Sequence, residues 1–224
     1  MLYQAVSRRI ILRLSASADE QFNSVEVRAN GGKVMTTVTL PTTPGSRLDG
    51  QRALVTGAGR GLGLAMAAAL AEAGAHVTLA ARSSDEVEAV AEAIRQRGDH
   101  AEALTLDVTD TARVENEVAE KGPFKVLINN AGTNRPAELL EITEEDYDAV
   151  TDLNVRAAVF VTKAVAKGMI DAELPGSIIN VSSQMGHVGG PKRTVYCATK
   201  FAIEGATKAL ALELGPHGIR VNTI

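Results

Sequence analysis

The 224-residue chain contains one cysteine, no tryptophan and few aromatic residues, which make up 3% of the total. The single cysteine, Cys197, has no internal partner, so nothing in the covalent chemistry requires an oxidising compartment, and we predict a cytoplasmic location. No apolar run approaches the length that spans a bilayer, so no membrane partner is predicted. The net charge of -4 and the even spread of Lys and Arg provide no basic footprint for nucleic acid.

The chain also has few histidines, and their spacing does not suggest ligands. His76, His100, His187 and His217 are scattered along the sequence, so no metal site is predicted. His187 lies in the glycine-rich stretch "SSQMGHVGG", where two roles are open. It could contact substrate from this loop, but a solvated loop histidine is the simpler interpretation.

Residues 1–47 differ in composition from the rest of the chain. The stretch "SRRIILRLSAS" is basic and partly apolar, but it is short, Arg13 interrupts it, and no small-residue cleavage site follows cleanly. A targeting segment is therefore the alternative, and a disordered extension upstream of Met35 is the simpler interpretation. Residues 36–47, "TTVTLPTTPGSR", are predicted to be a Thr/Pro linker, which leaves one large domain at residues 48–224.

From Leu48 onward, short apolar runs alternate with segments of helical period. The runs are apolar on both faces, which is typical of a parallel sheet covered on both sides, so the predicted fold class is α/β with right-handed crossovers. Ser83 and Glu86 form a capping box that predicts a helix start after the second strand. Strands are predicted at "RALVTG", "AHVTLAA", "AEALTL", "FKVLINNAG", "SIINVSS" and "IRVNTI", and helices over 61–73, 84–97, 111–121, 143–169 and 195–214.

A glycine-rich turn, "TGAGRGLG", connects the first predicted strand to an apolar helix. Gly57, Gly61 and Gly63 have the spacing GxxxGxG. A strand, a glycine turn and a helix in this order can bind phosphate, because backbone N–H groups and the helix dipole meet the anion and glycine permits its close approach. The alternative is a flexible turn without a ligand, but the flanking strand and helix favour a dinucleotide site.

Charge near the adenosine ribose distinguishes the two nicotinamide dinucleotides. An NAD site usually has an acidic residue at the end of the second strand, where this chain has Arg82 in "LAARSS". Arg60 lies inside the glycine turn, and two guanidinium groups suit a 2'-phosphate. NADP(H) is therefore favoured over NAD(H), although solvated arginines and a nearby Asp85 keep the alternative open.

Tyr196 and Lys200, in "TVYCATK", are four residues apart on one face of a predicted helix, with Cβ atoms roughly 6 Å apart. A nearby ammonium favours the phenolate form and moves a tyrosine toward general acid-base catalysis. Alone, this spacing is more typical of an ordinary amphipathic surface pair. Cys197 points about 100° away round the helix, so a buried structural thiol is the preferred interpretation.

Further motifs connect this pair with the glycine turn. The chain also has "LDV" at 106–108, "NNAG" at 129–132, the Asn of "DLNV" and "NVSS" at 180–183. In this order the motifs resemble the short-chain dehydrogenase/reductase family from about Leu48 to the last residue. The resemblance implies a single-domain Rossmann fold, a doubly wound parallel sheet with strand order 3-2-1-4-5-6. It further implies an NAD(P)(H)-dependent oxidoreductase that interconverts a secondary alcohol and a ketone.

The family pattern also assigns roles to individual residues. Tyr196 would be the general acid-base, and Lys200 would assist it while binding the nicotinamide ribose. Ser183, thirteen residues before Tyr196, would orient the substrate, with Ser182 as a structural neighbour, and Asn154 would hold a relay water. The implied cofactor-binding residues are Gly57, Arg60, Gly61, Leu62, Gly63, Arg82, Asp107, Val108, Asn130, Ala131, Gly132, Tyr196 and Lys200.

The chain departs from the family pattern at its end. It stops at "GIRVNTI" in the sixth strand, where the family normally continues with a turn at the nicotinamide, a substrate-covering segment and a last helix and strand. The alternatives to an active enzyme are therefore a dinucleotide-binding module without catalysis and an inactive fragment. The resemblance also implies a small carbonyl or alcohol substrate and a homodimer or homotetramer, and it leaves the identity of the substrate open.

Overall fold

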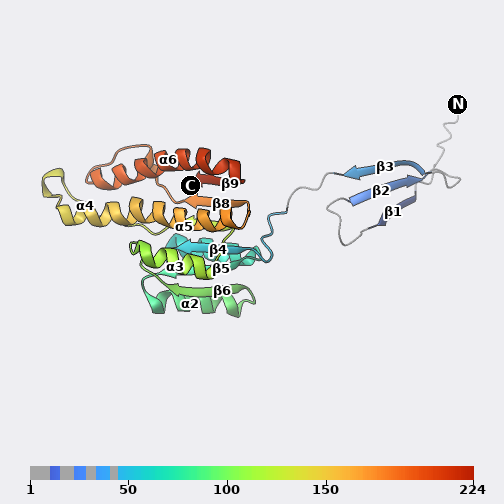
Figure 1. Ribbon diagram of the computed structural model, residues 1–224, viewed down its shortest axis with the longest axis horizontal. Helices are drawn as coiled ribbons and strands as arrows, with labels where there is room; N and C mark the ends of the chain where they lie inside the picture. Colours follow the sequence, from blue (N-terminus) through green and yellow to red (C-terminus); the bar gives the residue numbers. More distant parts are fainter. Residues whose placement is uncertain (1–10, 16–22, 29–33, 41–44) are drawn as a thin grey trace, which may run out of the picture. The chain divides into compact units, whose positions relative to one another are not determined.

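A computed structural model describes residues 11–15, 23–28, 34–40 and 45–224 (Figure 1). The chain divides into two compact units, Met1–Ser46 and Arg47–Ile224, one residue before the boundary expected from the sequence. In the first unit, β1 (Ile11–Ser15), β2 (Asn23–Arg28) and β3 (Val34–Leu40) form an antiparallel sheet in that order.

These strands differ from the disorder expected for residues 1–47. The segments "NSVEVR" and "VMTTVTL" are rich in Val and Thr, whose branched side chains suit a pleated surface. The prolines and threonines of residues 36–47 favour a linker by composition. Thr36 to Leu40 instead belong to β3, so the segment between the strand and the second unit is shorter than the predicted linker.

The second unit contains a parallel sheet with the strand order β6-β5-β4-β7-β8-β9. This order is the predicted 3-2-1-4-5-6 and confirms the α/β fold class. The strands are β4 (Arg52–Thr56), β5 (His76–Ala81), β6 (His100–Thr105), β7 (Val126–Asn129), β8 (Gly176–Asn180) and β9 (Ile219–Thr223). The helices are α1 (Gly61–Glu72), α2 (Ser84–Gln96), α3 (Thr111–Lys121), α4 (Glu144–Thr151), α5 (Ala158–Asp171) and α6 (Thr194–Leu214).

Local sequence explains where several helices begin. The Ser83 hydroxyl accepts a hydrogen bond from the Glu86 amide, as the capping box predicts. Thr143 caps α4 in the same way through the Asp146 amide. The helix predicted over 143–169 is interrupted, because a π-helical segment, Asp152–Ala157, separates α4 from α5. Such wide turns in otherwise regular helices often occur at functional sites.

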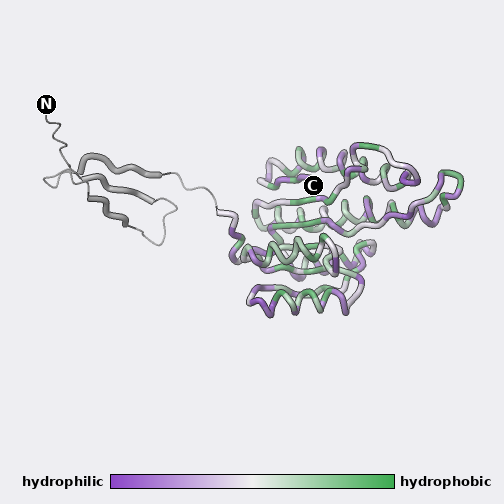
Figure 2. Tube along the Cα trace, turned by 180° about the vertical axis from the view of Figure 1, so that it is seen from behind, coloured by the Kyte–Doolittle hydropathy of each residue, from purple (hydrophilic) through white to green (hydrophobic). Residues whose placement is uncertain are grey.

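The core lies on both faces of the sheet. On the central strand β4, Leu54 packs into one buried cluster and its neighbour Val55 into the other, because successive strand side chains point to opposite faces. Figure 2 shows hydrophobic residues recurring along the strands, while the helices alternate between hydrophobic and hydrophilic positions. Within the described residues, no helix is both long enough and apolar enough to span a bilayer.

The central strand provides a test of this core. We expect Leu54→Ala to lower the free energy of unfolding by about 3 kcal/mol, because Leu54 is 1% exposed and its loss leaves a cavity. Leu140→Ala is the matched control, since Leu140 is 97% exposed and should change stability by less than about 0.5 kcal/mol. Urea unfolding followed by circular dichroism measures both variants, and equal losses would contradict this core assignment.

Candidate active site

The glycine turn after β4 is shaped by close backbone contacts. Gly57 has a φ of 63°, and a Cβ there would lie 2.9 Å from the Cα of Ala131. At Gly63, a Cβ would lie 2.2 Å from the Gly57 carbonyl oxygen, so a side chain is excluded. Gly61 begins α1 after the extended residue Arg60, and no side chain caps the helix. The first amides of α1 are therefore available to an anion.

A hydrogen-bonded clamp attaches this turn to the end of β7. The Thr56 hydroxyl accepts hydrogen bonds from the amides of Asn130 and Ala131, at 3.0 and 3.1 Å. The Asn130 side chain donates to the carbonyl oxygens of Thr56 and Gly57, at 2.9 and 3.0 Å. The motif "NNAG" thus holds the glycine turn in place. Thr56 was missed from the sequence, although it directly precedes the first motif glycine.

A cleft of about 480 Å³ extends from the glycine turn along the carboxyl ends of β4, β5 and β6. Carboxyl ends of parallel strands are where open α/β sheets bind ligands. The structure brings most of the predicted cofactor residues into its lining: Gly57, Arg60, Leu62, Arg82, Asp107, Val108, Asn130, Ala131 and Gly132. Gly61 and Gly63 lie in the adjoining turn and first helical residues, while Tyr196 and Lys200 come from α6.

Charges of both signs line this cleft. Arg60 is 85% exposed, and its guanidinium lies 3.7 Å from a carboxylate oxygen of Glu86, a cleft residue that the sequence analysis did not single out for the cofactor. Arg82 is exposed and belongs to the same lining. Burial opposes the ionised form of Asp107, but hydrogen bonds from Thr109 and the charge of Arg82 lower its pKa below the ordinary value. The arginines therefore share the cleft with two carboxylates.

Tyr196 and Lys200 lie on the first turns of α6 and face each other. The Lys200 ammonium lies 5.6 Å from the centre of the Tyr196 ring. Lys200 is 7% exposed, and it donates a hydrogen bond of 2.8 Å to the carbonyl oxygen of Val181, just after β8. Burial lowers the pKa of Lys200 below its ordinary value. The predicted pair is thus brought together and anchored to the end of the sheet.

Asn154, in the π-helical segment, ties this pair to the loop after β7. Its carboxamide oxygen accepts from the Thr133 amide at 2.8 Å, and its NH₂ group donates to the Thr133 carbonyl at 2.9 Å. The same NH₂ group donates to the Thr199 hydroxyl, which in turn donates to the Tyr196 carbonyl oxygen. Asn154 is buried and its NH₂ group is fully engaged, so its observed contacts position the helix turn that carries Tyr196.

The two candidate serines follow β8 and have different surroundings. Ser183 is half-buried, and its hydroxyl accepts a hydrogen bond of 3.1 Å from the Met185 amide at the start of a short 3-10 turn. Ser182 is 9% exposed, and its amide donates to the Ile224 carbonyl oxygen. Ser183 thus has the more accessible hydroxyl of the two, and the assignment of Ser182 as structural stays a prediction.

The histidines are less scattered in the fold than in the sequence. His76 and His100 occupy paired positions on β5 and β6, and their rings stack with centroids 4.2 Å apart. Sequence separation concealed this contact because strand pairing sets it. Among the described residues, no group of three or more metal-ligating side chains comes together. His187, predicted to be a solvated loop residue, is 67% exposed and lies near Glu204. Cys197, predicted to be a buried thiol, is half-buried, with its sulfur against the Met185 sulfur.

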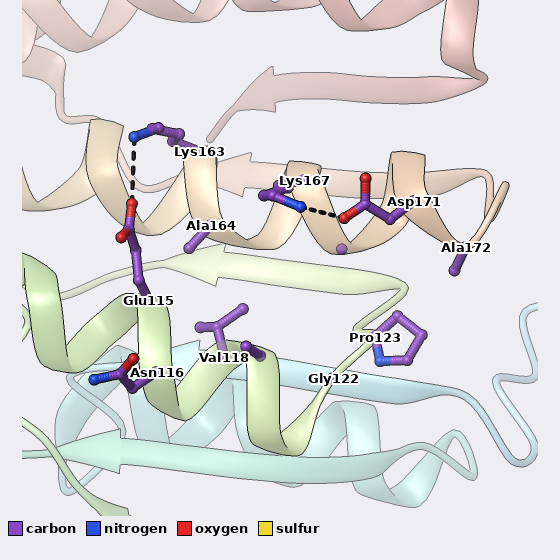
Figure 3. Close-up of a pocket in the computed structure, with 12 residues that line it drawn as sticks. Glu115, Asn116, Val118, Gly122, Pro123, Lys163, Ala164, Lys167, Asp171 and Ala172 are labelled. Atoms are coloured by element: carbon purple, nitrogen blue, oxygen red, sulfur yellow. Dashed lines mark hydrogen bonds and ion pairs between the residues drawn. The ribbon is translucent and has the colours of Figure 1, made fainter.

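A larger hollow, of about 700 Å³, lies between α3 and α5 (Figure 3). Lys163 bonds to Glu115 across it at 3.2 Å, and Lys167 pairs with Asp171 along α5. Its lining includes the ends of both helices and the Gly122-Pro123 turn that precedes β7. It therefore lies toward the amino ends of the strands, away from the predicted catalytic residues.

Comparison with known proteins decides the family. The family model for short chain dehydrogenases matches residues 51–224. The chain belongs to the short-chain dehydrogenase family. This short-chain dehydrogenase is accordingly a nicotinamide-dependent oxidoreductase, which confirms the predicted family and enzyme class.

Individual relatives support this membership. A D-erythrulose reductase from Gallus gallus is 42% identical over 175 residues, covering 78% of this chain and 70% of that protein. An L-xylulose reductase from Mesocricetus auratus is 40% identical over 177 residues, covering 79% and 71%. The crystal structure of a gluconate 5-dehydrogenase from Burkholderia cenocepacia, in complex with NADP and tartrate, has a TM-score of 0.75 and 36% identity. That comparison covers 80% of this chain and 71% of the other.

The buried amine predicts a specific dependence of stability on pH. Because the pKa of Lys200 is lowered by folding, stability should rise with pH between that lowered value and the ordinary value of 10.5. We expect the stability of the wild type relative to Lys200→Met to increase across this window, measured by urea unfolding from about pH 7 to about pH 10. Lys208→Met, an exposed change on the same helix, is the control. A difference that does not vary with pH would contradict the prediction.

Proposed function

We propose that this short-chain dehydrogenase reduces a small polyhydroxylated ketone to the secondary alcohol, and catalyses the reverse oxidation, with NADP(H) as its cofactor. The observation that carries the catalytic part is the Tyr196–Lys200 pair, with the buried ammonium 5.6 Å from the ring centre. The names of the reductases of erythrulose and xylulose, and of the gluconate dehydrogenase, support the class of substrate. The NADP-bound relative supports the cofactor.

The residues of the cleft fit a dinucleotide. Gly57 and Gly63 leave room that a Cβ would fill, and the first amides of α1 are free for a pyrophosphate. Asp107 and Val108 line the end where the adenine would lie. Arg60 and Arg82 would bind a 2'-phosphate through charge-assisted hydrogen bonds. A bound nicotinamide would supply the hydride, while the proton has to come from the protein.

In reduction, the carbonyl carbon would accept the hydride that a bound nicotinamide supplies, and the carbonyl oxygen would take a proton from this chain's residues. Ser183 would donate a hydrogen bond that orients this oxygen. Tyr196 would transfer its hydroxyl proton to the oxygen, and the adjacent Lys200 ammonium would stabilise the resulting phenolate. Solvent then returns the proton to Tyr196. Asn154 would support this step by fixing the turn of α6 through Thr199, and a relay water at Asn154 stays a prediction.

Replacement of the proposed acid-base tests the catalytic assignment. We expect Tyr196→Phe to lower kcat for L-xylulose or D-erythrulose reduction about 10²- to 10⁴-fold while NADPH binding is kept. The reason is that phenylalanine preserves the ring but cannot transfer a proton. NADPH oxidation followed by absorbance measures the rate, and Tyr147→Phe, at an exposed tyrosine on α4, is the control. Equal rates for wild type and Tyr196→Phe would favour a binding module or an inactive fragment.

The cofactor preference can be tested by binding alone. We expect Arg82→Asp to weaken NADPH binding by at least about tenfold with little effect on NADH, because the carboxylate repels a 2'-phosphate. Glu86→Gln should strengthen NADPH binding about two- to fivefold, since it frees Arg60 from a competing carboxylate. Fluorescence titration gives the dissociation constants, and Arg220→Asp provides an equal charge change on β9. An unchanged NADPH to NADH ratio in Arg82→Asp would refute the assignment.

Assembly and location stay predictions. Val159 of α5 and Phe201 and Leu212 of α6 are exposed apolar side chains, and burial of such residues between copies would support the expected homodimer or homotetramer. The cytoplasmic location rests on the lack of disulfide chemistry in a chain with one cysteine.

A further inference from the structure

A glutamate on α6 connects three separate segments of the chain behind the proposed catalytic residues. Glu204 lies one turn beyond Lys200, and its side chain is 13% exposed. One carboxylate oxygen accepts a hydrogen bond of 3.1 Å from the Thr223 hydroxyl at the end of β9. The other lies 3.5 Å from the ring nitrogen Nε2 of His187, in the loop after β8. The carboxylate therefore links the helix, the last strand and this loop.

The Ser182 hydroxyl also acts on this carboxylate. The pKa of Glu204 is lowered first by the Ser182 hydroxyl, against the effect of burial, and further by Thr223, His187 and Lys208. No hydrogen bond of normal geometry joins Ser182 and Glu204. The Ser182 hydroxyl and the Glu204 oxygen that lies near His187 are buried and have no hydrogen-bond partner among the described residues.

The loop lies directly on the helix at this point. A Cβ at Gly186 would come within 2.8 Å of the Ser182 hydroxyl and 3.2 Å of both the Glu204 Cγ and the Lys200 carbonyl oxygen. Gly186 is buried, and its amide donates to the Ser183 carbonyl oxygen. Gly186, which is hydrogen-bonded to Ser183, is thus packed against α6 beside the Lys200 carbonyl oxygen and the Glu204 side chain.

We propose that Glu204 is a positioning residue that holds the catalytic loop, residues 182–188, against α6 and so sets Ser183 relative to Tyr196. The inference rests on the proposed function, in which Ser183 and Tyr196 act on the substrate. Glu204 acts through the loop, because its described contacts are with His187 in the loop and with Thr223 at the end of β9. Loss of its charge releases the loop without changing the glycine turn that binds the cofactor.

The chain contains its own reporter of loop position. Cys197, the single cysteine, lies on α6 with its sulfur 3.8 Å from the Met185 sulfur and 3.9 Å from the Val188 carbonyl oxygen. Both contacts belong to the catalytic loop. A loop held against α6 shields the thiol, and a released loop exposes it to a reagent such as 5,5'-dithiobis(2-nitrobenzoate).

The test compares Glu204→Gln with the wild type and with Glu213→Gln, an exposed glutamate on the same helix. We expect Glu204→Gln to accelerate Cys197 labelling about tenfold, because a hydrogen-bonded charge is removed from the loop. The kcat/KM for L-xylulose should fall by a similar factor, and the dissociation constant for NADPH should stay within about twofold. Glu204→Asp, which keeps the charge, should recover part of both effects, whereas Glu213→Gln should behave as the wild type.

The outcomes separate this proposal from the proposed function. Unchanged labelling in Glu204→Gln would overturn the positioning role whatever the activity. Faster labelling together with weaker NADPH binding would also overturn it, because the damage would then extend beyond the loop. If Glu204→Gln fails to fold by circular dichroism, Thr223→Val and His187→Gln test the same contacts individually. If labelling responds while the wild type and Tyr196→Phe show equal rates, the loop contact stands and the catalytic proposal fails.

Discussion

The hydrogen bond between the Lys200 ammonium and the Val181 carbonyl oxygen is the contact on which the candidate site depends. It joins the first turns of α6 to the carboxyl end of β8 at 2.8 Å, so it fixes a helix against a sheet at the edge where the cleft opens. Burying a lysine is unfavourable, and the lowered pKa of Lys200 reflects that cost. A protein that needed only stability would be expected to place an apolar side chain there.

Polar contacts around this lysine restrict the site on both sides. Asn154 and Thr199 hold the helix turn of Tyr196, and they do so from a π-helical segment that a regular helix would not provide. One turn further along α6, Glu204 contacts His187 in the loop after β8 and Thr223 at the end of β9. Asn154 and Thr199 are buried and hydrogen-bonded, and satisfied buried polar groups fix a single geometry more strictly than apolar packing does.

The cofactor side of the cleft depends on backbone geometry more than on side chains. The glycine turn, the free amides of α1 and the Thr56–Asn130 clamp suit any dinucleotide. In the proposed function, selectivity between NADP(H) and NAD(H) rests on a few exposed charges, of which Arg60 already has a carboxylate partner in Glu86. Exposed pairs of this kind interact weakly, so small changes here can alter the preference without affecting the fold.

The sequence alone determined the α/β fold class, because apolar periodicity and glycine spacing act over short distances along the chain. The strand order and the roles of the site residues were implied by the resemblance to the family, and those roles stay predictions. Disorder of residues 1–47 was expected from composition and differs from the three strands there, since proline and threonine content says little about pairing. A single helix over 143–169 was also expected, and a regular period cannot reveal a π-helical interruption.

Only the tertiary structure decided the partners of Lys200, Asn154 and Glu204 and the stacking of His76 on His100. Those contacts join residues far apart in sequence, and their geometry is set by how strands, loops and helices pack.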